Sequence, residues 1–95
     1  MGPTCEVLLN TVEDLTLDKI DSVLDRTSEQ IERTRKGRSW NIWVRGQPIH
    51  VEITDVPPTV HLSAGCNSTE DYRILGELSQ LLADETGGLA SKPEK

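Results

Sequence analysis

The sequence predicts an α+β fold in two layers: a three-stranded antiparallel meander with two helices packed on one of its faces. Two observations carry this prediction. Apolar and polar residues alternate over 40–66, as in half-buried strands, and residues with helical spacing lie before and after that stretch. The expected order is helix, three strands, helix, and an extra strand at the N-terminal end is left open.

Length and composition indicate a single small domain. The chain has 95 residues, of which 35% are hydrophobic, and it has no Phe, so the core must be mainly aliphatic. The net charge of −6 disfavours nucleic acid as a partner. No apolar run approaches a membrane span, and neither a secretion signal nor a disulfide framework is visible, so a cytoplasmic chain is expected. We expect the domain to cover residues 1–88 and residues 89–95 to form a disordered tail.

The first helix is predicted to run from Thr16 to the basic residues before Gly37. Thr16 is a good N-cap, and Gly37 is a typical stop signal. The residues with helical spacing are Leu17, Ile20, Val23, Leu24, Thr27 and Ile31. The polar side is acidic and comprises Glu13, Asp14, Asp18, Asp21, Asp25, Glu29 and Glu32. Arg33, Arg35 and Lys36 would lie in the last turn, where the helix dipole favours cations.

The alternating stretch predicts two hairpins. Gly46-Gln47 fits a two-residue turn, which would pair Val44 with Ile49. The second turn follows Asp55, and it would pair Thr54 with Thr59. Both pairings place the apolar residues on one face of the meander.

Two further elements are predicted. Ser68 and Asp71 form a capping-box pattern that starts the second helix, and Gly87-Gly88 ends it. Residues 5–10 form either a short strand or an extended arm.

The polar face of the meander is the first candidate site. Its candidate binding residues are Trp43, Arg45, His50, Glu52 and His61. Trp and Arg are enriched at interface hot spots, so this face is a plausible protein-binding surface. Ordinary cross-strand pairing and pairing of two copies of the chain are the alternatives.

Two chemical sites are alternatives to this surface. His50, Glu52 and His61 could point the same way, and two His with one carboxylate can hold a metal. Cys66 lies just before a helix start, where a thiol can become nucleophilic, although its parity places it on the buried face. Neither pattern matches a specific motif, so no cofactor and no metal are expected.

The sequence therefore favours a small acidic, non-enzymatic protein-binding domain, such as an adaptor, a chaperone-like factor or an inhibitor. It would use the outer sheet face or the acidic side of the first helix. The alternative is a small metal-binding or cysteine-dependent enzyme that uses His50, Glu52, His61 or Cys66.

Overall fold

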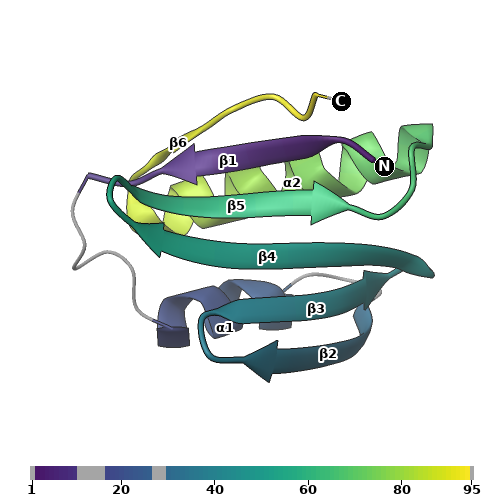
Figure 1. The fold of residues 1–95 in the computed structure, drawn as a ribbon, viewed down its shortest axis with the longest axis horizontal. Coiled ribbons are helices and arrows are strands. Elements are labelled where there is room, and N and C mark those ends of the chain that lie inside the picture. Colours follow the sequence, from purple (N-terminus) through teal and green to yellow (C-terminus); the bar gives the residue numbers. More distant parts are fainter. Residues whose placement is uncertain (1, 11–16, 27–29, 95) are drawn as a thin grey trace.

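Six strands form one antiparallel sheet, and two helices lie on one of its faces (Figure 1). The structure is a computed structural model that describes residues 2–10, 17–26 and 30–94. In chain order the elements are β1 (Thr4–Leu8), α1 (Leu17–Arg26), β2 (Gln30–Lys36), β3 (Ser39–Val44), β4 (Gln47–Asp55), β5 (Pro58–Ala64), α2 (Thr69–Thr86) and β6 (Leu89–Ala90). The strand order is β2-β3-β4-β5-β1-β6. The predicted α+β class is confirmed, with a sheet wider than the predicted meander.

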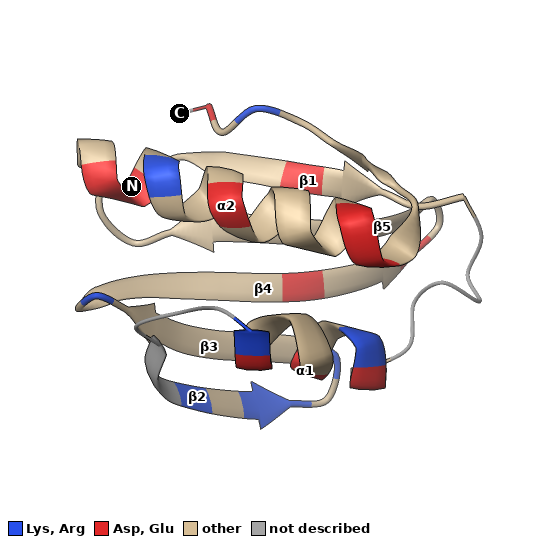
Figure 2. Cartoon of the chain, turned by 180° about the vertical axis from the view of Figure 1, so that it is seen from behind, with Lys and Arg blue, Asp and Glu red and all other residues tan. Residues whose placement is uncertain are grey.

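The core lies between the sheet and the two helices, which both lie on the near side of the sheet in Figure 2. Helix α2 buries Ile74, Leu75, Leu78 and Leu82, and α1 buries Ile20, Val23 and Leu24. The core is aliphatic except for Trp40 and Cys5, and Trp40 is its largest fully buried side chain. The opposite sheet face carries no helix from the described part of the chain.

The first hairpin turns one residue earlier than predicted. Its turn residues are Arg45 and Gly46, with φ of 52° and 80°, instead of Gly46 and Gln47. Two positive φ values suit the right-handed twist of a hairpin. Val44 therefore pairs with Gln47 instead of Ile49. Because pairing shifts by two residues, each side chain keeps its predicted face.

The second hairpin and the second helix agree with the sequence. Thr54 pairs with Thr59. Ser68 caps α2 and Asp71 completes the capping box, because each side chain accepts from the backbone N–H of the other. Gly87 ends the helix in the left-handed conformation, with φ of 75°.

The prediction for the first helix is wrong from Gln30 onward. Residues 30–36 form the edge strand β2, which includes the basic residues that were assigned to the last helical turn. Arg33 and Arg35 pair with Ile42 and Trp40 of β3, so they lie on the inner sheet face, above α1. The predicted cap and several stripe and acidic positions lie outside the described residues: Glu13, Asp14, Thr16, Thr27 and Glu29.

The first and last described segments of the chain belong to the sheet. Strand β1 is flanked by β5 and β6, so the strand left open in the sequence is present. Residues 89–94 do not form the predicted loose tail, because they follow β1 with backbone hydrogen bonds from Ser91 to Glu6 and between Thr4 and Glu94. The described helices include none with the length and apolar character to cross a membrane.

Candidate functional site

The outer sheet face is built from the polar positions of four strands. Because side chains alternate along a strand, residues paired across the sheet share this face. His61 of β5 pairs with Glu52 of β4 and with Glu6 of β1, so it stands between two carboxylates. In the neighbouring row His50 pairs with Ser63.

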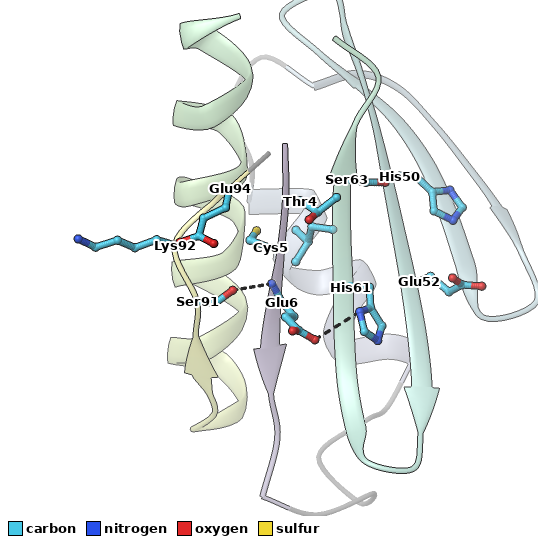
Figure 3. Close-up of a pocket in the computed structure, with 11 residues that line it drawn as sticks. Thr4, Cys5, Glu6, His50, Glu52, His61, Ser63, Ser91, Lys92 and Glu94 are labelled. Carbon is cyan, nitrogen blue, oxygen red and sulfur yellow. Dashed lines mark hydrogen bonds and ion pairs between the residues drawn. The ribbon is translucent and has the colours of Figure 1, made fainter. Parts of the chain in front are cut away.

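These rows form the floor of an open groove of about 500 Å³. Figure 3 shows its side chains, which come from the β4, β5 and β1 strands and from the segment after β6. Its lining residues are Thr4, Cys5, Glu6, His50, Glu52, His61, Leu62, Ser63, Ser91, Lys92 and Glu94. Glu6, Glu52 and Glu94 outnumber Lys92, whose side chain extends away from the groove in Figure 3. The groove is therefore rich in carboxylates.

The two histidines are held by neighbours on the same face. His50 Nδ1 lies 2.9 Å from Asn41 Oδ1. His61 Nε2 lies 3.1 Å from Thr54 Oγ1, and its Nδ1 lies 3.5 Å from Glu6 Oε2. Each imidazole is thus oriented by a neighbouring side chain. Ordinary cross-strand pairing in a sheet produces contacts of this kind too.

Trp43 lies at one corner of the outer face. Its side chain is 43% exposed, although the β3 neighbours Ile42 and Val44 are buried. A hollow of about 210 Å³ lies beside it, between Trp43, Pro48 and His50. At the diagonally opposite corner Leu8 pairs with Leu89, and these side chains are 48% and 75% exposed. The polar groove therefore lies between two apolar corners.

Arg45 does not join the predicted surface. It lies in the β3–β4 turn, and its guanidinium forms ion pairs with Glu70 and, at 3.6 Å, with Glu77 of α2. Its side chain is only 19% exposed. The other four predicted residues, Trp43, His50, Glu52 and His61, do lie on the outer face.

The cysteines lie away from the histidines. Cys66 is exposed instead of buried, because β5 ends at Ala64 and the face alternation ends with it. Cys5 is buried on the inner side of β1, with Sγ 3.8 Å from the Leu75 carbonyl oxygen. Desolvation by burial raises the pKa of the Cys5 thiol to about 11, which suppresses its thiolate. In the described ranges no group of three or more His, Cys, Asp or Glu is arranged to hold a metal ion.

The acidic side of α1, the second predicted surface, is partly used within the fold. Asp21 accepts hydrogen bonds from Arg35 at 2.7 Å and from Trp40 Nε1 at 2.9 Å. Asp25 accepts one from Arg33 at 2.6 Å. These carboxylates hold α1 against the sheet, whereas Asp18 remains exposed.

The sequence prediction missed the contribution of the chain ends to the groove. Thr4 and Glu6 come from β1, and the Glu6 backbone N–H donates a hydrogen bond to Ser91 Oγ at 2.9 Å. The alternation of exposed Thr4, Glu6 and Leu8 with apolar residues was the available signal. Nothing in the sequence pattern indicates that residues 91–94 return to β1.

Comparison with protein families places the chain. A model described as a family of unknown function, DUF6368, matches residues 1–59. The chain belongs to DUF6368. No curated protein and no solved structure matches it. The part matched by the DUF6368 model includes Glu6, Trp43, His50 and Glu52, whereas His61 lies beyond it. Most of the outer-face residues therefore lie in the part of the chain that the family model matches.

Proposed function

We propose that this DUF6368 chain is a non-enzymatic protein-binding domain whose contact surface is the outer sheet face. One observation carries the proposal: both helices pack on the inner face, while the outer face presents an open groove beside the exposed Trp43. An exposed Trp beside a groove is the kind of anchor that dominates protein interfaces.

The composition of the groove favours binding over catalysis. Its side chains project from neighbouring strands onto an open surface, and each histidine already has a neighbour that orients it. Cys66 is not among the residues that line it. The two free cysteines suit the cytoplasm, which we propose as the location.

Site-specific photo-crosslinking tests the proposal. A benzophenone amino acid replaces Trp43 in one variant and Asp84, which is exposed on α2, in the other. After irradiation in native lysate, we expect a discrete adduct from position 43 and none from position 84. The adduct partner is then purified, and its affinity for the chain is measured by calorimetry.

Trp43→Ala should weaken that affinity by about 30-fold, the size typical of an interface hot spot. Asp84→Ala is the matched control and should leave it unchanged. An adduct confined to position 84, or a purified partner indifferent to Trp43→Ala, would refute the proposal. An adduct between two copies of the chain would assign the face to self-association.

A further inference from the structure

In the described part of the chain, the carboxylates that line the groove form no ion pair with an arginine. The arginine side chains all form ion pairs with carboxylates elsewhere: Arg26, Arg33, Arg35, Arg38, Arg45 and Arg73. Their partners lie on the helices or at the β4–β5 turn, in residues such as Glu85, Asp25, Asp55 and Glu70. None of these partners lines the groove.

The groove carboxylates have few cationic neighbours. Glu52 is exposed and forms no ion pair within the described ranges, and Glu6 has only the imidazole of His61 at 3.5 Å. Lys92 extends away from the groove in Figure 3. Lys36 lies at the β2 edge, on the far side of Ser39 from Glu52. Because the chain already has a net charge of −6, an added cation on this face would be attracted at long range as well.

The apolar residues on this face lie at its two ends. From Trp43 to Leu8 there are three steps along the strands, each of two residues, and three steps across the sheet, from β3 through β4 and β5 to β1. With about 6.6 Å per row and about 4.8 Å per strand, this diagonal is roughly 25 Å. An extended segment of about eight residues covers that distance, within the 32 Å long axis of the molecule.

We propose that the outer face binds an extended protein segment with Arg or Lys at its centre and an apolar residue near each end. The basic side chains pair with Glu6 and Glu52, and the apolar residues contact Trp43 and the Leu8–Leu89 corner. A helical partner fits less well, because it would need a continuous apolar stripe to lie along. This inference rests on the proposed function and adds the chemistry of the partner.

Fluorescence anisotropy with a defined peptide tests it. The probe is a labelled nine-residue peptide with Leu near each end and two Arg at its centre. The control peptide carries citrulline at both Arg positions, which keeps the shape and removes the charge. We expect the Arg peptide to bind roughly five- to tenfold more tightly, and its preference to fall as salt rises.

Charge-removing variants locate the contact. Glu6→Gln and Glu52→Gln should each reduce the preference for the Arg peptide, and the double variant should abolish it. Asp18→Asn removes an exposed carboxylate from α1, on the other side of the molecule, and should leave the preference for the Arg peptide unchanged. Circular dichroism checks that each variant folds, and these exposed positions leave the core intact.

Equal binding of the two peptides, or a preference that survives in the double variant, would overturn the inference. A stable dimer by light scattering that Trp43→Ala dissociates would also overturn it, because a second copy would occupy the face. If position 43 crosslinks a partner whose affinity ignores Glu6→Gln and Glu52→Gln, the proposed function stands and only the partner chemistry fails.

Discussion

At the scale of single residues, the environment of a side chain follows its position in the strand alternation. Trp40 and Trp43 are three residues apart, yet Trp40 is fully buried and Trp43 is 43% exposed. The two cysteines also differ, because Cys5 occupies an inner position of β1, whereas Cys66 lies beyond the end of β5, where the alternation has ended. Their reactivity should therefore differ although both are free thiols.

We predict that iodoacetamide modifies Cys66 and leaves Cys5 intact in the folded protein near pH 8. The thiolate is the reactive form, and burial keeps the pKa of Cys5 at about 11. Peptide mass spectrometry after timed labelling measures both sites. As a control, the two cysteines should react at similar rates in denaturant. Equal labelling of both cysteines in the folded chain would contradict the burial of Cys5 on the inner side of β1.

At the scale of elements, Asp21 joins the first helix to the sheet. Its carboxylate accepts hydrogen bonds from Arg35 of β2 and from the indole N–H of Trp40 in β3. The Asp21 side chain is 27% exposed and the Trp40 indole is buried, so removing the charge of Asp21 weakens the hydrogen bond of a buried N–H.

We therefore expect Asp21→Asn to lower the free energy of unfolding by about 1–3 kcal/mol. Asp18→Asn, on the same helix but exposed, should change it by less than about 0.5 kcal/mol. Urea titrations followed by circular dichroism compare the two variants. Similar midpoints for both would show that Asp21 does not connect α1 to the sheet.

The same network explains which elements the sequence could predict. Helix α2, with its capping box and leucine stripe, follows from local signals, and so does the hairpin of β4 and β5. Strand β2 does not, because its inner positions Arg33 and Arg35 are charged and form ion pairs with Asp25 and Asp21 of α1. A basic segment that follows an acidic helix is typical of the last turn of a helix. Only the pairing of this segment with β3 identifies it as a strand. The missed parts of the groove have the same cause, since Glu6 and Glu94 meet only through long-range pairing.

A second element-scale prediction concerns pH. The pKa of Glu70 is lowered by its hydrogen bond to Arg73 and, to a smaller extent, by the charge of Arg45. A carboxyl with a lowered folded pKa stabilises the fold above its unfolded pKa and loses that effect as pH falls through the folded value. Glu70→Gln should thus destabilise the protein slightly at pH 7 and not at pH values well below 4.5, the ordinary value. Urea midpoints at the two pH values measure the difference, and a constant gap would contradict the ion pairs of Glu70 with Arg73 and Arg45.

At the scale of the whole molecule, strand order and chain order differ. The middle strands β4 and β5 are neighbours in sequence, whereas β1 and the C-terminal residues reach the sheet by pairing over long sequence separations. The inner residues of β4 and β5, such as Val51 and Val60, are fully buried. The segment at the other extreme, residues 89–94, has exposed side chains at most positions, including Leu89 at 75%. Stability should therefore be uneven across the sheet.

We predict that hydrogen exchange separates these two regions. Amides in β4 and β5 should exchange only through nearly complete unfolding, because breaking them exposes the core on the inner face. The amides of Ser91 and Glu94 should exchange much faster, since the segment that carries them can open without exposing buried apolar surface. The control is the urea dependence of the exchange rates, measured by NMR at subdenaturing urea concentrations. The exchange rates of the β4 and β5 amides should rise with urea, and those of the Ser91 and Glu94 amides should not. If all these amides responded to urea equally, the C-terminal segment would be part of the cooperative core, and the edge of the proposed groove would be as rigid as its floor.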